Sequence, residues 1–307
     1  MKINKKLIQN FLTIRYDPEN QLANLAKWQD FTTKNSDLDG KKTEILLKKS
    51  VKYSIPDDEE PLAISLSSGI DSSLCLALLR DVFPNRKITA ICGVFENGND
   101  ESKIAKKIAE KFSADFKTVY MDSIFTNMPE IISISKKPRW NTYNHLISKE
   151  AKKHSNYLVT GDGADELFGG YTFRYQKFKQ LSKSNDNWVT KVKKYLECHN
   201  RDWVIDQNLL FGTNIQFNWE TIYNYFKPYF QNKLEPIVQV MLADFNGKLS
   251  LDFIPTGKAI FNHYKIHGIP IFLNSNSLLS QSISFLFLSA NLQAEHTPSS
   301  SKVILGL

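Results

Sequence analysis

Short apolar runs alternate with helical patterns along residues 61–161, and this alternation constrains the fold more than any other feature of the sequence. The runs typical of strands are LAISL, KITAICGVF, FKTVYM and YLVTG. Between them lie stretches with the apolar spacing of helices: DSSLCLALLRDVF, ESKIAKKIAEKF and NTYNHLISKEAKKHS. Strands that alternate with helices form parallel sheets with helices on both faces, so the sequence predicts an α/β fold.

The segments on either side of this core have different patterns. Residues 1–59 are polar and irregular apart from one helical stretch, KTEILLKKSVKY. Beyond about residue 180 the pattern is helical and rich in aromatic residues, without strand alternation. We therefore predict three parts: an N-terminal linker and helical segment at 1–59, a core at 60–180, and a helical C-terminal lobe at 181–307.

Composition places the chain among soluble proteins. It is 42% hydrophobic and 23% charged, and its formal net charge of +7 suits either anionic partners or a lysine-rich solvated surface. Cys75 and Cys92 lie inside apolar runs, as buried thiols do, which favours a reducing compartment. The run ISFLFLSA is far shorter than the ~20 residues of a membrane helix. We expect a cytoplasmic protein with no membrane partner.

The first unusual loop, SLSSGIDSS, follows the first predicted strand. Serine hydroxyls and the free amides of a helix N-terminus are donors for an anion such as phosphate, and Gly69 allows close approach. Asp71 would repel a phosphate unless a divalent cation lay between them, and magnesium is held by one or two carboxylates plus phosphate oxygens. The alternative is an ordinary serine-capped helix.

A second loop, GDGADELFGGY, follows the fourth predicted strand and supplies Asp162, Asp165 and Glu166. The alternative is a surface turn with a capping acid pair. Both loops come after strands, and parallel sheets bind ligands beyond the carboxyl ends of their strands. The two loops together therefore predict a phosphate and metal site at one edge of the sheet.

These two motifs resemble those of a known family. LSSGIDSS resembles the LSGGxDSS pyrophosphatase loop of the adenine nucleotide α-hydrolase superfamily. GDGADELFGGY is similar to the second signature of asparagine synthetases and the related β-lactam synthetases. FLTIRYDPEN and IPIFLN are similar to the family's linker and its RVPFLD stretch, so the resemblance covers about residues 9–307. It implies a Rossmann-like sheet and the family's synthetase domain, without the N-terminal glutaminase domain.

The resemblance implies an ATP-dependent amide ligase that forms AMP. A carboxylate, with aspartate as the best candidate, would be adenylated with release of pyrophosphate and then passed to ammonia, giving asparagine. Two alternatives stay open: a weakly active nucleotide-binding subunit that needs a partner, and an adenylating ligase for another carboxylate. Binding of nucleic acid is not expected, because no recognisable RNA module is present.

The resemblance also assigns roles to residues. Asp71 and Asp165 would hold Mg²⁺, Asp162 would accept a proton from the amine, and Asp162, Asp165 and Glu166 form the expected catalytic set. The residues expected to contact ATP are Leu66, Ser67, Ser68, Gly69, Asp71, Ser72, Ser73, Val94, Phe95, Thr160 and Gly161.

The sequence departs from the family at several positions. Ser68 replaces a usual glycine, which is tolerable if its φ is negative. His267, Ile269 and Asn274 stand at an expected glutamate, arginine and aspartate. His267 is either structural or a replacement proton-handling group. No residue matches the family's glutaminase half or its C-terminal lysine-bearing loop, so we expect ammonia from solution or a separate glutaminase subunit, and a truncated C-terminal lobe.

Overall fold

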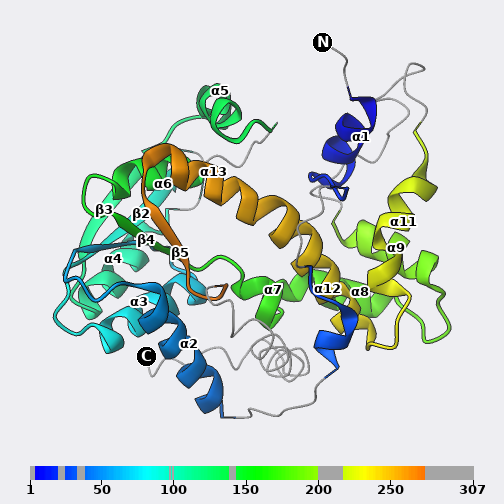
Figure 1. Cartoon of the computed structure of the whole chain (residues 1–307), viewed down its shortest axis with the longest axis horizontal. Coiled ribbons are helices and arrows are strands. Elements are labelled where there is room, and N and C mark those ends of the chain that lie inside the picture. The colour runs from blue at the N-terminus through cyan, green and yellow to red at the C-terminus, as the bar shows by residue number, and fades with distance from the viewer. Residues whose placement is uncertain are drawn as a thin grey trace. The chain divides into compact units, whose positions relative to one another are not determined.

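The computed structural model describes residues 4–19, 25–32, 39–96, 98, 100–137, 143–199 and 217–273 (Figure 1). Asn274 and the stretch SSSKVILGL lie outside these residues.

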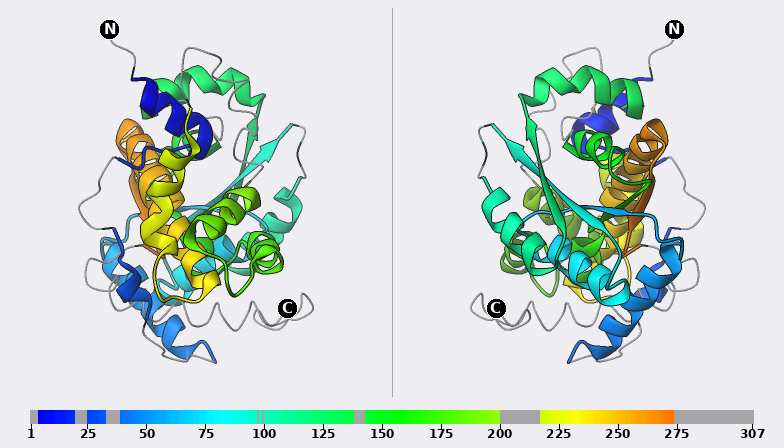
Figure 2. Two further views of the ribbon diagram at one scale, coloured as in Figure 1. Left: turned by 90° about the vertical axis from the view of Figure 1, so that its right-hand side faces the viewer. Right: turned by 90° about the vertical axis from the view of Figure 1, so that its left-hand side faces the viewer.

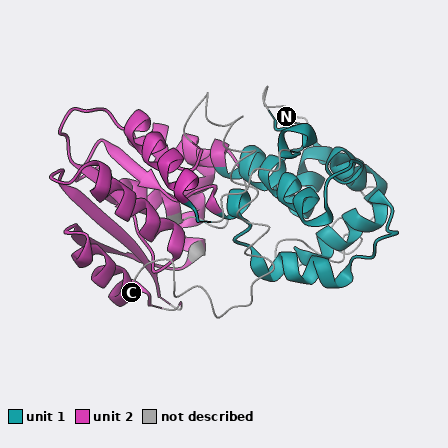
Figure 3. Ribbon diagram, turned by 90° about the horizontal axis from the view of Figure 1, so that it is seen from below, with its two compact units in different colours: residues 1–40, 165–253, 280–307 teal, residues 41–164, 254–279 magenta. Residues whose placement is uncertain are grey.

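The chain forms two compact units, drawn in different colours in Figure 3. Unit 1 comprises Met1–Gly40, Asp165–Phe253 and Ser280–Leu307, and unit 2 comprises Lys41–Ala164 and Ile254–Leu279. The domain boundaries expected at residues 59 and 180 stay a prediction.

Unit 2 is built on a parallel sheet, as the alternating pattern predicts. The strand order is β3-β2-β1-β4-β5, and each neighbouring pair is parallel. The strands are β1 (Leu62–Ser65), β2 (Ile88–Phe95), β3 (Asp115–Met121), β4 (Tyr157–Thr160) and β5 (His267–Pro270). β1 lies in the centre and is almost fully buried, which explains its continuous apolar sequence.

Helices cover both faces of this sheet, so the predicted fold class is confirmed (Figures 1 and 2). α3 and α4 pack on one face, and α6 on the other, where α13 packs against α6. Alternate strand residues point to opposite faces, and Ala63, Ile91 and Leu158 form one core cluster with Ile147 of α6. The helices of unit 2 are α2 (Lys41–Ser54), α3 (Ile70–Val82), α4 (Ser102–Lys111), α5 (Ile124–Ser135), α6 (Tyr143–Ala151) and α13 (Ile254–Tyr264).

Two of these elements have no counterpart in the sequence prediction. α5 contains Pro129, and Glu130 ties it to the rest of unit 2: the Tyr264 hydroxyl donates to its carboxylate (3.3 Å) and the His145 Nε2 lies 3.5 Å away. β5 contains Gly268 and Pro270, two residues that disfavour strands. β5 is an edge strand, where proline is tolerated, and the Phe261 ring occupies the space that a Cβ on Gly268 would need.

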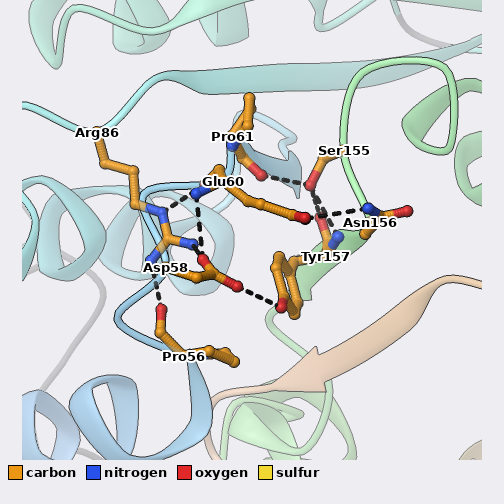
Figure 4. Close-up of polar contacts among 8 residues, drawn as sticks. All are labelled: Pro56, Asp58, Glu60, Pro61, Arg86, Ser155, Asn156 and Tyr157. Carbon is orange, nitrogen blue, oxygen red and sulfur yellow. Dashed lines mark hydrogen bonds and ion pairs between the residues drawn. The ribbon is translucent and has the colours of Figure 1, made fainter.

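A buried guanidinium holds the chain where it enters β1. The Arg86 side chain is only 5% exposed, and it donates to the carbonyl oxygens of Pro56 (2.8 Å) and Glu60 (2.6 Å) and to Asp58 Oδ1 (2.5 Å). The Tyr157 hydroxyl donates to the second oxygen of Asp58 (2.6 Å) (Figure 4). The first residue of β4 is thereby joined to the segment that leads into β1.

Two further contacts join the same strand starts. The Ser155 hydroxyl donates to the carbonyl oxygen of Pro61 (2.6 Å), and the Asn156 side-chain amide donates to the Glu60 carboxylate (3.0 Å) (Figure 4). Because a backbone carbonyl left unpaired away from water costs free energy, the Ser155 bond helps to fix the level at which β1 and β4 begin.

A second arginine, Arg80, closes the C-terminal ends of α3 and α4. Its guanidinium donates over 2.8–3.4 Å to the carbonyl oxygens of Phe83, Pro84, Arg86, Phe112 and Ser113. Terminal helix carbonyls have no partner within the helix, so one planar side chain satisfies groups from two helices and the turn before β2.

Unit 1 is helical in its described part, whereas α13 and β5, which lie within the lobe predicted at 181–307, belong to unit 2, so that lobe stays a prediction. The elements of unit 1 are α1 (Lys5–Ile14), the 3₁₀-helix η1 (Trp28–Phe31), α7 (Ala164–Phe168), α8 (Thr172–Leu181), α9 (Trp188–Cys198), α11 (Trp219–Phe230), α12 (Pro236–Asp244) and the π-helix η3 (Phe245–Phe253). Across the described ranges of both units, no helix is long and apolar enough to cross a membrane.

Asp244, at the end of α12 in unit 1, carries a fully buried carboxylate. It accepts hydrogen bonds from the Tyr195 hydroxyl (2.7 Å) and from His199 Nε2 (3.1 Å). Burial alone raises the pKa of Asp244, but His199, Lys248 and the Tyr195 hydrogen bond together outweigh it and the pKa is lowered. The π-helix follows directly, and the Tyr16 hydroxyl occupies the space beside Gly247 where a Cβ would stand.

We predict that Arg80→Lys lowers the free energy of unfolding by about 2 kcal/mol or more, because a single ammonium cannot reach carbonyls on two helices. Urea unfolding measures this difference. Lys87→Arg, at a 68% exposed side chain nearby, is the control and should change stability by less than about 0.5 kcal/mol. An Arg80→Lys protein as stable as the control would contradict the role given to Arg80.

Candidate functional site

The two unusual loops follow neighbouring strands in the middle of the sheet. β1 leads into residues 66–69 and then α3, while β4 leads into Gly161. From β1 the chain builds outward to β2 and β3 on one side, whereas β4 and β5 lie on the other. The loops therefore lie at the point where the strand order changes direction, which is where open α/β sheets bind ligands.

Serine hydroxyls shape the first loop. The Ser67 amide donates to the Ser72 hydroxyl oxygen (3.0 Å), and the Gly69 amide donates to the Ser67 hydroxyl oxygen (3.1 Å). The hydroxyls of Ser72 (3.3 Å) and Ser73 (2.7 Å) both donate to the Gly69 carbonyl. The dense run of hydroxyls thus holds the chain in a fixed turn at the start of α3.

Ser68 contacts a residue that sequence reasoning missed, Glu101. The Ser68 amide (2.9 Å) and hydroxyl (2.7 Å) both donate to Glu101 Oε2. The backbone at Ser68 does not have a positive φ, so the serine meets the condition under which it can replace glycine. The signal that could have found Glu101 is its position after β2, at the same edge of the sheet as both loops.

The second loop touches the first at Gly161. A Cβ on Gly161 would lie 3.3 Å from the Asp71 Cβ and 3.4 Å from the Ser72 amide nitrogen, so the backbones approach closely. The Thr160 hydroxyl donates to Asp162 Oδ2 (2.9 Å). Burial raises the pKa of Asp162, with the Thr160 hydrogen bond acting against it. The structure therefore brings Asp71, Thr160, Gly161 and Asp162 together.

The buried thiol of Cys75 lies below this junction, one helical turn after Asp71. Burial raises its pKa, and the negative charges of Asp71 and Asp162 raise it further. The charges of both carboxylates therefore act on one buried thiol. The three cysteines are free and buried, which agrees with the sequence interpretation of Cys75 and Cys92.

Asp165 and Glu166 open α7, where unit 1 resumes. The Tyr171 hydroxyl donates to Glu166 Oε1 (2.7 Å), and burial raises the pKa of Glu166 to about 7. Burial also raises the pKa of Asp165, against the positive charges of Lys248 and Arg174. Asp71 belongs to unit 2, so the expected magnesium pair of Asp71 and Asp165 stays a prediction.

Two cations that sequence reasoning missed flank this acid pair. Lys248 Nζ lies 4.4 Å from the ring centroid of Tyr171, and Arg174 Cζ lies 4.5 Å from the same centroid. Both are cation–π distances, and both charges favour ionised carboxylates nearby. Arg174 follows the glycine-rich loop directly, whereas Lys248 lies on the π-helix, for which the sequence has no simple signal.

The remaining predicted residues lie at other points of unit 2. Val94 and Phe95 end β2 at the same edge as the loops, Val94 buried and Phe95 exposed; their contact with adenine stays a prediction. His267 begins β5, pairs with Tyr157 in the strand register, and stacks on its ring at 5.5 Å. That is the amino edge of the sheet, away from the loops, which argues against proton handling by His267 at this site.

The family model described as asparagine synthase matches residues 42–236. Asparagine synthetase [glutamine-hydrolyzing] 1 of Bacillus subtilis is 31% identical over 116 residues, which are 36% of this chain and 18% of that protein. A putative asparagine synthetase [glutamine-hydrolyzing] of Mycobacterium tuberculosis is 37% identical over 141 residues, 43% of this chain and 22% of that protein.

The matched segments thus span less than a quarter of the length of either relative. Among solved structures, NMN synthetase from Francisella tularensis superposes with a TM-score of 0.36 and 14% identity, covering 78% of this chain and 100% of that one.

Gly170→Ala tests Asp165 without changing its chemistry. A Cβ on Gly170 would stand 1.9 Å from Asp165 Oδ1, so the carboxylate must rotate away. If Asp165 holds magnesium, we expect magnesium-dependent ATP binding to weaken about tenfold. Calorimetry over a range of magnesium concentrations measures this. Gly257→Ala is the control, because its Cβ meets the Phe261 ring at an ordinary 3.5 Å; equal effects of both variants would contradict the assignment.

Titration of the Glu166 carboxyl group should lower the free energy of unfolding as the pH rises. Its folded pKa of about 7 lies above the 4.5 of an unfolded glutamate, so the folded state binds the proton more tightly between these values. We expect Glu166→Gln to gain roughly 2–3 kcal/mol relative to the original chain between pH 5 and pH 8. Urea unfolding without divalent ions measures this, with Glu110→Gln on α4 as control. Parallel pH profiles would contradict the burial of an ionisable group here.

Proposed function

The chain belongs to the asparagine synthase family, and on this premise we propose that it is an ATP-dependent carbon–nitrogen ligase. It adenylates a carboxylate, with aspartate as the best candidate, and transfers the activated acyl group to ammonia. The observation that carries the proposal is the contact between the serine loop after β1 and the acidic loop after β4, made by Gly161 against Asp71.

The serine loop is proposed to bind the phosphates. The first amides of α3 point out of the helix, and the helix dipole adds positive potential at this end. Ser67, Ser68 and Ser72 contribute hydroxyls, and the exposed backbone at Gly69 leaves room for an anion. Val94 and Phe95, at the end of the neighbouring β2, are proposed to contact the adenine.

The donor chemistry also fits Mg²⁺. Within the described residues no group of three histidine, cysteine or acidic side chains forms a metal site by itself. Magnesium is commonly held by one or two carboxylates and phosphate oxygens, so we propose that Asp71 and Asp165 are its protein ligands and that ATP supplies others. When bound, the ion neutralises phosphate charge. The half-buried position of Asp71 at the junction of the loops supports this assignment.

Asp162 is proposed to accept the proton of the attacking amine. Its carboxylate lies beside the loop junction, and burial moves its pKa upward, toward the range in which a carboxylate is an effective base. In the first step a carboxylate oxygen of the substrate attacks the α-phosphorus and the bond to pyrophosphate breaks. In the second, ammonia attacks the acyl carbon, AMP leaves, and one proton passes to Asp162. Glu166 completes the proposed catalytic set as the neighbour of Asp165.

A second candidate is a ligase for a carboxylate other than aspartate. The resemblance places an arginine at position 269, but Ile269 is buried in β5 opposite Val159 of β4. His267, at the position of an expected glutamate, lies at the far edge of the sheet. An apolar residue and a distant histidine at these positions favour a different mode of recognition for the acceptor carboxylate.

Ammonia is proposed to come from solution or from a separate glutaminase subunit. Both relatives described above carry the words glutamine-hydrolyzing in their names, and this chain matches only part of each. Addition of a glutaminase in trans to the ligase reaction, with glutamine as the only nitrogen source, distinguishes the two sources.

We predict that the chain catalyses exchange of labelled pyrophosphate into ATP only when the substrate carboxylate and magnesium are present. Asp71→Asn should lower the exchange rate at least about a hundredfold, because a metal ligand is lost beside the phosphates. Asp81→Asn is a matched control: it lies ten residues further along α3 and pairs with Lys48 (2.9 Å). Absence of exchange with aspartate but exchange with another amino acid would favour the second candidate.

A further inference from the structure

The Glu101 carboxylate accepts hydrogen bonds from the serine loop, residues 65–73, and not from its own helix α4. Glu101 stands at the N-cap of α4, but its side chain makes no capping hydrogen bond there. The Ser102 amide donates instead to Asp100 Oδ1 (2.9 Å). Glu101 Oε2 accepts from the amide and the hydroxyl of Ser68, which is 33 residues earlier in the chain.

The two Ser68 donors differ from the other donors of the loop. The amides of Ser67 and Gly69 already donate to the loop's own hydroxyl oxygens. Ser68 instead takes its acceptor from another element, and that acceptor is an anion. A carboxylate oxygen that receives two hydrogen bonds is a close equivalent of a phosphate oxygen in the same position, since both form short, charge-assisted bonds.

One pair of donors cannot serve two anions fully at the same time. A phosphate oxygen close to Ser68 would also lie close to Glu101 Oε2, and two negative charges at such a distance repel each other. Ser68 is exposed, so a phosphate can reach it from solvent. Glu101 must then move away from Ser68 as the phosphate arrives.

We propose that Glu101 is an internal competitor for the phosphate position of the loop. It occupies the Ser68 donors when no phosphate is bound, is displaced on binding, and returns as pyrophosphate leaves. Its effect is to weaken the loop's affinity for pyrophosphate and so to favour release of that product. The inference rests on the proposed function, because it presumes that the loop binds the phosphates of ATP.

Binding of inorganic pyrophosphate, followed by calorimetry at fixed ionic strength, tests the proposal. We expect Glu101→Gln to bind about five- to tenfold more tightly than the original chain, since a neutral amide oxygen holds Ser68 less strongly and does not repel the ligand. Glu110→Gln is the matched control, because it removes the same charge at an exposed position on the same helix, where Glu110 pairs with Lys106 (3.9 Å). The control should bind no more than about twofold more tightly.

Two further variants separate displacement from simple repulsion. Glu101→Asp keeps the charge but withdraws the carboxylate from Ser68, so displacement predicts tighter binding here too, while repulsion alone predicts no gain. In a Ser68→Gly chain, which lacks the hydroxyl donor, the gain from Glu101→Gln should shrink, as expected for two residues that interact. The proposal would be overturned if Glu101→Gln bound pyrophosphate more tightly but Glu101→Asp did not. It would also be overturned if Glu101→Gln bound pyrophosphate more weakly than the original chain.

The failure of this inference can be told apart from failure of the proposed function. If the original chain binds pyrophosphate and Glu101→Gln binds it no better than Glu110→Gln does, Glu101 is not a competitor and the proposed function stands. If no variant binds pyrophosphate or ATP, while circular dichroism and thermal unfolding show folded proteins, both the proposed function and the inference are wrong.

Discussion

The position of β1 depends on the ion pair and hydrogen bonds of Arg86. This side chain is 5% exposed, and its cost of burial is offset by Asp58 and by two backbone carbonyls. Because Tyr157 shares the Asp58 carboxylate, β1 and β4 begin in a fixed relation. Both strands are only four residues long. The relative position of their starts therefore also fixes the relative position of their carboxyl ends, where the two loops begin. Removal of the guanidinium would leave the Pro56 and Glu60 carbonyls and the Asp58 carboxylate without their shared donor, and would loosen the start of β1 from the start of β4.

In unit 1, burial is the main influence on three acidic residues. Asp165, Glu166 and Asp244 are held in a water-poor setting, where each ionised carboxylate is costly. Tyrosine hydroxyls, His199, Arg174 and Lys248 reduce that cost, but they leave the pKa of Glu166 near neutrality. The buried acids of unit 1 therefore depend on partners from α8, from the end of α9 and from the π-helix η3.

The sequence predicts the parts of this protein that have a local cause. Hydrophobic periodicity predicts β1, β2, α3 and α4. Both loops can be identified from their residue types, because hydroxyl, glycine and carboxylate chemistry can be recognised before the fold is known. α5 and β5 do not follow, because Pro129, Gly268 and Pro270 argue against the elements in which they stand. Pairing with β4 and packing of Phe261 against Gly268 override those preferences. Glu101 and Lys248 are missed for the same reason: their partners are distant in the chain, and only the folded backbone brings them together.

The thiol of Cys75 has a practical consequence. It is fully buried between α3 and β4, within 3.9 Å of the Thr160 carbonyl oxygen, and burial raises its pKa. A reagent such as iodoacetamide can reach it only when the start of α3 separates from the end of β4, which is the motion that would open the junction of the two loops. The rate of alkylation at Cys75 therefore measures how often this junction opens. Peptide mass spectrometry distinguishes Cys75 from Cys92 and Cys198. A molecule that bridges the two loops would slow alkylation at Cys75.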